Sequence, residues 1–193
     1  MDYRRRLPHI YRPGCPAFIT FRLHGSLPAN RDFSPANVIS GQAFVAMDRI
    51  LDQAATGPRF LSMPRIANVV ADAIRSQRGF EAHSWVVMPN HVHLLITPYE
   101  DCAEPIRLLK GSTSREANLL LSRTGVPFWQ SESYDHIVRD DREFHRIAGY
   151  IENNPICAGL ANTPEEFCWS SAAGTSLSVA RRKRVSCGVD PST

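Results

Sequence analysis

The sequence lacks an apolar run long enough to span a membrane, so we expect no membrane partner. The charged residues 1–6 are followed by no apolar segment of the kind found in signal peptides. The 5 cysteines are scattered, with no Cys-x-x-Cys pair, which argues against a disulfide framework and against a zinc finger. We therefore expect reduced thiols and a cytoplasmic location.

The sequence also lacks a large excess of one sign of charge. The net charge of +3 is compatible with a nucleic-acid partner but does not identify one. The 193 residues, 43% of them hydrophobic, suffice for one well-formed core. We expect a single domain over residues 1–172. Residues 173–193 contain the basic run 181–184 and are predicted to be a flexible tail.

The most informative stretch covers residues 85–97, which read as strand, tight turn and strand. The apolar first arm ends at Pro89-Asn90, a pair that favours a turn. Along the second arm, alternation places His91 and His93 on one face. Two neighbouring imidazoles can bind one metal ion, although two histidines that are each hydrogen-bonded near a strand end would give the same pattern. A metal site would need a third ligand from elsewhere in the chain.

The rest of the chain alternates between strand-like and helix-like segments. Aromatic and β-branched runs predict strands, and apolar residues at helical spacing predict helices. The predicted strands are 17–23, 80–88, 91–97 and 133–139, and the predicted helices are 34–55, 64–76, 104–122 and 140–154. This βαββαβ order predicts an α+β fold with a ferredoxin-like antiparallel sheet. Helices would cover one face, and the histidines would lie on the other, open face.

The last predicted helix carries a tyrosine and an amide on one side. Asp140 and Glu143 fit a capping box at its start, and Pro155 is expected to stop it. Tyr150 and Asn154 are four residues apart and therefore share a helix face. Above the open sheet face, Asn154 would offer an amide oxygen to a metal, with the phenol of Tyr150 beside it. A surface tyrosine and a C-terminal asparagine cap would fit the same spacing, and the spacing alone favours this interpretation.

Taken together, these stretches resemble the REP-associated tyrosine transposases of bacteria, which are single-tyrosine HUH transposases. The resemblance is carried by residues 17–22, 87–95, 128–131, 134–139, 150–160 and 169–171. It implies that His91 and His93 bind the metal, that Asn154 is the third ligand, and that Tyr150 is the nucleophile. Tyr134 ranks below Tyr150 because no amide follows it at helical spacing. His136 is the next candidate should Asn154 not be a ligand.

The resemblance also implies a reaction. Such enzymes cleave single-stranded DNA at hairpins through a 5′-phosphotyrosine intermediate and can rejoin the ends, as a monomer or a homodimer. A phenol is a poor nucleophile at neutral pH, so a divalent cation that polarises the phosphate is expected, either Mg²⁺ or Mn²⁺. The fold implied is the same ferredoxin-like sheet, with the tyrosine helix lying over the active-site face.

Basic side chains are candidates for contacts with DNA phosphates. Each of them would equally suit a solvated helix face. The candidates are Lys110, Arg115, Arg139, Arg142 and Arg146.

Two other function classes are compatible with parts of the pattern. A metal-dependent hydrolase built on His-x-His would need more histidine and aspartate ligands than we identify. A non-catalytic nucleic-acid-binding module on the same scaffold would keep the fold but not the chemistry. Replacing Tyr150 by phenylalanine separates the transposase from this module, because only the transposase forms a covalent bond to DNA.

Overall fold

The computed structural model describes residues 12–27, 48, 50–52, 57–100 and 103–173. Most of the helix predicted over 34–55 and residues 174–193 of the predicted tail lie outside this part of the chain. The domain boundary at residue 172 therefore stays a prediction. None of the helices in the described residues is long and apolar enough to cross a bilayer.

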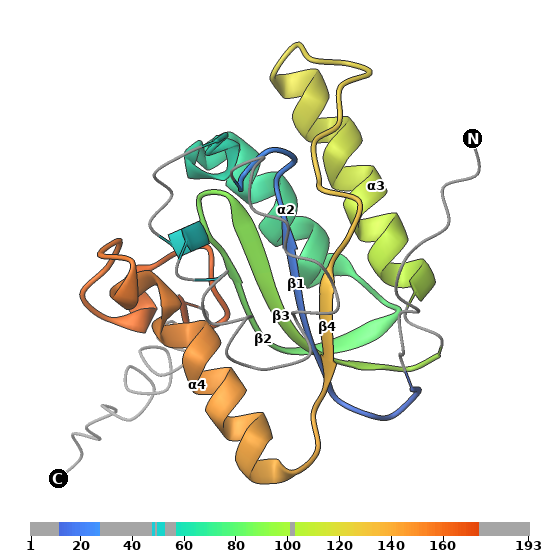
Figure 1. Cartoon of the computed structure of the whole chain (residues 1–193), viewed down its shortest axis with the longest axis vertical. Helices are drawn as coiled ribbons and strands as arrows, with labels where there is room; N and C mark the ends of the chain where they lie inside the picture. The colour runs from blue at the N-terminus through green and yellow to red at the C-terminus, as the bar shows by residue number, and fades with distance from the viewer. Residues whose placement is uncertain (1–11, 28–47, 49, 53–56, 101–102, 174–193) are drawn as a thin grey trace, which may run out of the picture.

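A four-stranded sheet forms the centre of the molecule (Figure 1). Its strands are β1 (Ala17–Arg22), β2 (Phe80–Val87), β3 (His91–Pro98) and β4 (Tyr134–Ile137). They lie in the order β2-β3-β1-β4, and every neighbouring pair is antiparallel. This order and direction confirm the predicted α+β antiparallel fold.

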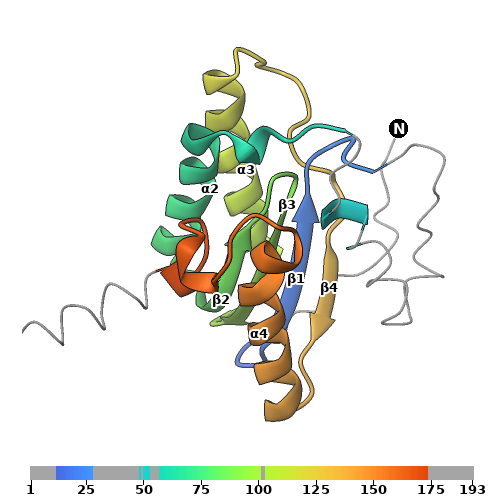
Figure 2. The ribbon, with the colours of Figure 1, turned by 90° about the vertical axis from the view of Figure 1, so that its left-hand side faces the viewer.

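Helices lie on both sides of this sheet. The helices α2 (Pro64–Ser76) and α3 (Ala103–Leu120) cover one face, as Figure 2 shows. The long helix α4 (Asp141–Cys157) packs against the other face through Ile147 and Ile151. Two short 3-10 helices, Phe60–Ser62 and Pro164–Glu166, lie in the connections.

The alternation predicted for β3 is confirmed. Val92, Leu94 and Ile96 pack in the core under α2 and α3, whereas Leu95 packs on the opposite face with residues of α4. The prediction that this opposite face is open is wrong. His91 and His93 are 0% exposed. Residues 50–52, which are helical, contribute Leu51 to the apolar cluster on this face, next to the histidines.

Helix α4 does not stop at Pro155, contrary to the prediction. It runs on to Cys157, because proline removes only one backbone donor and the following residues keep their own bonds. Gly159 ends the helix in the left-handed region, with φ of 68°, and its N–H donates to the Ile156 carbonyl. Asn154 is therefore inside the helix and buried, so it is not a C-terminal cap.

The start of α4 carries half of the predicted capping box. The Asp140 carboxylate accepts a hydrogen bond from the Glu143 N–H at 2.7 Å. The Glu143 carboxylate accepts a hydrogen bond from the N–H of Arg139 at 2.9 Å, and not from the N–H of Asp140 as a full capping box requires. Both bonds fix the chain where β4 turns into α4.

Candidate metal and nucleophile site

Two buried imidazoles of β3 face each other on the sheet face covered by α4. Their Nε2 atoms are 3.0 Å apart. Each Nδ1 is held from behind: that of His91 lies 2.7 Å from Asn90 Oδ1, and that of His93 lies 2.8 Å from Thr20 Oγ1. Partners of this kind fix the ring orientation of metal-binding histidines. Both Nε2 atoms thus point toward one shared space.

The protonation of His91 follows from its neighbour. Asn90 Nδ2 donates to the Leu51 carbonyl at 3.0 Å, so the amide oxygen of Asn90 is the atom that faces His91. His91 Nδ1 therefore carries the hydrogen, and Nε2 keeps its lone pair. Burial, followed by repulsion from His93, lowers the pKa of His91 to about 3, against the attraction of Asp48. His91 is thus neutral and able to bind a cation.

Two carboxylates approach the same space from the helical residues before Pro58. Asp48 Oδ1 lies 3.3 Å from His93 Nε2 and 3.9 Å from His91 Nε2. Asp52 Oδ1 lies 3.7 Å from His91 Nε2. The ligand atoms of Asp48, His91 and His93 all lie within 4.8 Å of one another. This grouping of two nitrogens and a carboxylate oxygen has the composition of a metal site.

Asn154 reaches the histidines from α4. Its Nδ2 atom lies 3.5 Å from His93 Nε2, and its side chain is buried. Its Oδ1 atom has no hydrogen-bond partner within the described residues. Because the two ends of a carboxamide have nearly the same shape, a half-turn of the amide presents the oxygen to the same space.

The site contains buried carboxylate oxygens beside the two imidazoles. Burial raises the pKa of Asp48, but the attraction of His93 and then His91 outweighs it, so the pKa lies below its usual value. Burial and then repulsion from Asp48 raise the pKa of Asp52 to about 7. Within the described part of the chain, both Asp48 oxygens and Asp52 Oδ1 are buried without a hydrogen bond. A divalent cation would satisfy these acceptors, so the residues fit such an ion.

Tyr150 lies over the histidines. Its ring centroid is 5.6 Å from that of His93 and 6.2 Å from that of Phe18. With 37% of its surface exposed, it is open to a ligand from solvent. The Tyr150 ring, the amide of Asn154 and the imidazoles therefore lie together within one chain. The sequence spacing predicts only that Tyr150 and Asn154 share a helix face.

Tyr134 and His136, the lower-ranked candidates, face other groups. The Tyr134 ring packs edge-on against Phe18 at 6.1 Å, and burial, followed by repulsion from Glu143 and Asp135, raises its pKa. A raised pKa makes this phenol a poorer nucleophile. His136 Nε2 lies 3.1 Å from Glu143 Oε1, which ties β4 to α4.

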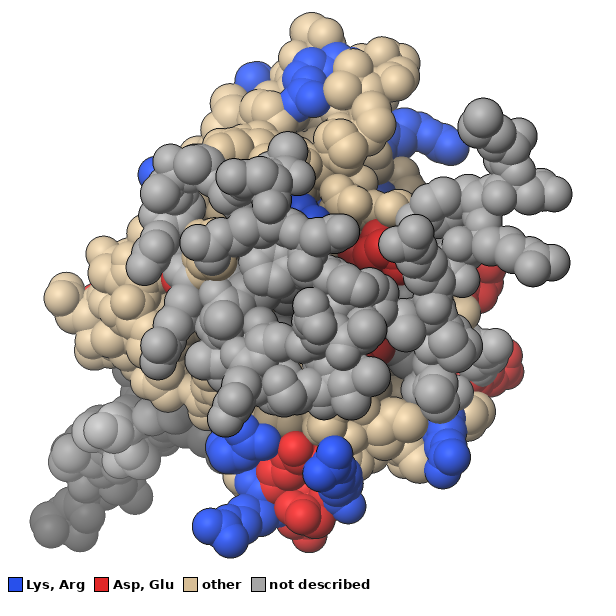
Figure 3. Space-filling view, in the orientation of Figure 1, with Lys and Arg blue, Asp and Glu red and all other residues tan. Residues whose placement is uncertain are grey.

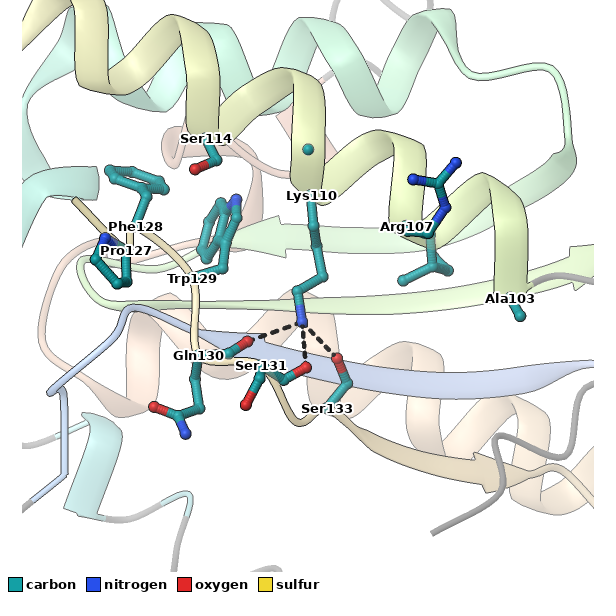
Figure 4. Close-up of a pocket in the computed structure, with 12 residues that line it drawn as sticks. Ala103, Arg107, Lys110, Ser114, Pro127, Phe128, Trp129, Gln130, Ser131 and Ser133 are labelled. Atoms are coloured by element: carbon teal, nitrogen blue, oxygen red, sulfur yellow. Dashed lines mark hydrogen bonds between the residues drawn. The ribbon is translucent and has the colours of Figure 1, made fainter. Parts of the chain in front are cut away.

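Lys110, one of the predicted phosphate contacts, is engaged inside the protein. Its Nζ atom donates to the Gln130 carbonyl at 2.9 Å, and to the Ser131 carbonyl and the Ser133 hydroxyl at 3.1 Å each (Figure 4). These bonds pin residues 130–133 to α3 beside a hollow of about 270 Å³. The hollow lies on the α3 side of the sheet, away from the histidines.

The four predicted arginine contacts are all exposed but do not form one surface. Arg139, Arg142 and Arg146 lie at the start of α4, where basic and acidic side chains alternate at the lower end of Figure 3. Arg146 pairs there with Glu143 at 3.1 Å. Arg115 lies on α3 instead. The first three therefore lie at or just before one end of α4, and Arg115 lies on a different helix.

Sequence reasoning missed the two aspartates and the residues behind the histidines. Asp48 and Asp52 are four residues apart within a predicted helix, so a shared helix face was the available signal. Thr20 carries no such signal, because its role depends on the register that pairs Thr20 with His93 across β1 and β3.

A family model described as "Transposase IS200 like" matches residues 63–154, which include His91, His93, Tyr150 and Asn154. Among curated proteins, the chain is 32% identical over 94 residues to an uncharacterised protein of Haemophilus influenzae, an alignment covering 37% of this chain and 52% of that one. It is 25% identical over 101 residues to a REP-associated tyrosine transposase of Escherichia coli, with coverage of 51% and 58%. The chain thus spans little more than half the length of these relatives.

A solved structure shares the fold over nearly the whole chain. It is described as a REP-associated tyrosine transposase bound to a REP hairpin. The TM-score is 0.54 at 20% sequence identity, with 99% of this chain and 88% of that chain covered. At this identity the match supports the shared fold.

Proposed function

Since a family model described as "Transposase IS200 like" matches residues 63–154, we propose that the chain is a transposase of this family, which cleaves and rejoins single-stranded DNA with Tyr150 as the nucleophile. The observation that carries the proposal is the meeting of Tyr150 and Asn154, both from α4, with the paired histidines of β3. A surface tyrosine without a function would not need a buried amide one turn further along the same helix. The proposed location is the cytoplasm.

His91, His93, Asp48 and Asn154 would hold the divalent cation, Mg²⁺ or Mn²⁺. The bound cation supplies a Lewis acid that polarises the scissile phosphate and stabilises its developing charge. Thr20 and Asn90 keep the two imidazoles turned toward the shared space, and α4 carries the phenol to its edge. The protein contributes position and orientation, which are the main needs of phosphoryl transfer.

The chemical step exchanges one phosphodiester for another. The Tyr150 oxygen forms a bond to phosphorus, and the bond from phosphorus to the 3′ oxygen breaks. The phenol loses a proton and the leaving 3′ oxygen gains one, so the step consumes no water and no net proton. The resulting 5′-phosphotyrosine keeps the bond energy, and attack by another 3′-hydroxyl reverses the step on a new strand.

Hairpin DNA is the proposed substrate, by extension from the solved relative that is bound to a REP hairpin. The exposed arginines at the start of α4 are proposed to contact its phosphates, and Arg115 is proposed as a separate contact. Lys110 is the weakest of the predicted contacts, because its hydrogens point to oxygens of residues 130–133. Binding that depends on phosphate contacts should weaken as salt rises.

The decisive test incubates the chain with labelled single-stranded hairpins and Mn²⁺, and then looks for a protein–DNA adduct in denaturing gels. Wild-type protein should form the adduct, and Tyr150→Phe should not, while still binding the hairpin. Tyr99→Phe is the matched control, because Tyr99 is 60% exposed and lies beyond the end of β3. Adduct formation by Tyr150→Phe would assign the nucleophile elsewhere, with Tyr134 tested next.

The same assay separates the alternative classes. A non-catalytic module would bind the hairpin without any adduct, and a hydrolase would release cut DNA without attachment to protein. Equal cleavage of a fully paired duplex would contradict the proposed preference for single strands.

A further inference from the structure

We propose that Asp52 is a further residue of the metal site and that, with Asp48, it lets the protein hold its divalent cation before DNA arrives. This inference rests on the proposed function, since it adds a residue to the same site. It starts from the position of Asp52 Oδ1, which lies 3.7 Å from His91 Nε2.

The two aspartates reach the histidines from one helical face. They are four residues apart, so their side chains project from adjacent turns in the same direction. Leu51 is fully buried and anchors this segment in the apolar cluster with Met88 and Leu95. The carboxylates are therefore directed at the imidazoles by packing and not only by their mutual spacing.

Asn90 adds a second anchor. Its side chain donates to the Leu51 carbonyl at 3.0 Å and accepts from His91 Nδ1 at 2.7 Å. The amide is fully buried, so water does not compete for these bonds. One side chain thus fixes both His91 and the backbone next to Asp52, and the distance between their polar atoms is set by the fold.

The acidic side chains lack any other cation in the described part of the chain. Their ion pairs there are only to His91 and His93, at 3.3–3.9 Å. The Asp48 side chain is 3% exposed, and neither of its oxygens has a hydrogen bond within the described residues. Buried carboxylates are stable when they are paired or bound to metal. Asp48 and Asn154 are both buried and have side-chain oxygens without a hydrogen-bond partner in the described residues. A bound cation would be a partner for these oxygens.

Counting charges shows what Asp52 would add. Two imidazoles and an amide form a neutral set, which depends on the DNA phosphate to balance a divalent cation. With the cation bound and both carboxyl groups ionised, Asp48 would supply one negative charge and Asp52 a second, so the set would match the +2 charge without DNA. Sites with more carboxylates bind hard divalent cations more tightly. Asp52 would act either on the ion directly or through a bound water.

The test titrates Mn²⁺ alone into the full chain without DNA, and follows free Mn²⁺ by electron paramagnetic resonance. Wild-type protein should bind one ion. Asp52→Asn keeps the shape and removes the charge, and it should weaken binding about tenfold, the lower end of the effect seen for residues around metal ligands. Asp48→Asn should weaken binding at least as much. Asp72→Asn is the control, because this exposed aspartate pairs only with Arg75 on α2 within the described residues.

The outcomes separate this inference from the proposed function. Unchanged Mn²⁺ affinity in Asp52→Asn overturns the inference, while loss of binding in His93→Ala would leave the proposed function in place. A wild-type chain that binds Mn²⁺ only with DNA also overturns it. If Asp52→Asn does not fold, hydrogen exchange on the wild-type chain takes its place. Mn²⁺ should then slow exchange of the amides at residues 50–52, and no slowing would contradict the inference.

Discussion

The two faces of the sheet are built from the same strands but differ in what they leave unsatisfied. Under α2 and α3, the buried side chains are mainly apolar, and polar atoms such as Trp129 Nε1 find a partner in Thr113 Oγ1 at 3.0 Å. Under α4, carboxylate and amide oxygens are buried without a hydrogen bond in the described residues. The first face pairs its polar atoms within the protein, whereas the second groups side chains that fit a divalent cation.

This difference separates stability from chemistry along a single strand. Because side chains of β3 alternate, Leu94 packs into the first face while its neighbour His93 points into the second. Neighbouring substitutions should therefore have effects of different kinds, which gives direct ways to test the comparison.

The largest effect should come from His93→Ala. Cleavage should fall at least about a thousandfold, because the phosphate loses its Lewis acid. The fold should survive with a loss of about 2 kcal/mol, since Thr20 loses its buried partner. Hairpin cleavage assays with Mn²⁺ and urea denaturation measure the two effects. Normal cleavage by this variant would end the metal interpretation.

Leu94→Ala should do the reverse. Removing a fully buried leucine from the packed face should lower the free energy of unfolding by about 3 kcal/mol. Mn²⁺ affinity of the folded variant should stay at the wild-type value, because the side chain points away from the ligands. Denaturation curves and Mn²⁺ titrations at low temperature test both statements. A large loss of Mn²⁺ affinity in a folded Leu94→Ala protein would show that the faces are coupled.

The pH dependence of the metal-free protein should sharpen the comparison. His91 has a folded pKa of about 3 against an ordinary value of 6.5, so unfolding takes up a proton in that window and stability rises with pH. Asp52 has a folded pKa of about 7 against 3.8, so its contribution has the opposite sign and is lost as pH rises to 7. The two oppose each other between about pH 4 and 6.5.

Asp52→Asn should therefore expose the dependence on His91. The stability of this variant without metal should rise from pH 4 to 6.5 by at least about 1 kcal/mol, while the wild-type profile is flatter. Leu94→Ala, which changes no titratable group, should keep the wild-type profile at lower stability. Urea midpoints at several pH values provide the measurement, and parallel profiles for the wild type and Asp52→Asn would contradict the expectation.

The smallest effect should come from Asn154. A carboxamide oxygen is a neutral, weak ligand, so Asn154→Ala should need several-fold more Mn²⁺ for the same cleavage rate. Asn154→Asp should need less, because its charge is added to the site. Asn153→Ala is the matched control, since that exposed side chain bonds only to the Gly149 carbonyl within the described residues, at 2.7 Å. If Asn154→Ala leaves the metal titration unchanged, this amide is not a ligand.

The sequence predicted the fold well because its signals are local. Alternation in β3 and helical spacing in α2 depend on neighbours along the chain, and the predicted bounds of α2, residues 64–76, agree with the structure. The predicted end of α4 is too early, because a proline favours a helix stop but Pro155 lies inside this helix. The left-handed Gly159, two residues beyond the helix, provides the actual end.

The candidate site was predictable only in part. Tyr150, Asn154 and the histidines share short spacings, whereas Asp48 meets His93 across 45 residues of chain, and no local pattern predicts such a contact. Burial of the histidines was also missed, because the sequence does not show that residues 50–52 pack beside them.

One edge of the sheet has a consequence for solubility. The N–H of Val87 donates to the Trp169 carbonyl, and the N–H of Ser171 donates to the Trp85 carbonyl, so residues 169–171 run along β2 as an added backbone partner. A chain shortened to end at Leu160 would expose the Val87 N–H and the Trp85 carbonyl to solvent, beside the apolar side chains of Trp85 and Val87. Unpaired strand edges of this kind recruit other chains. Such a truncation should self-associate even though every residue of the proposed site is still present.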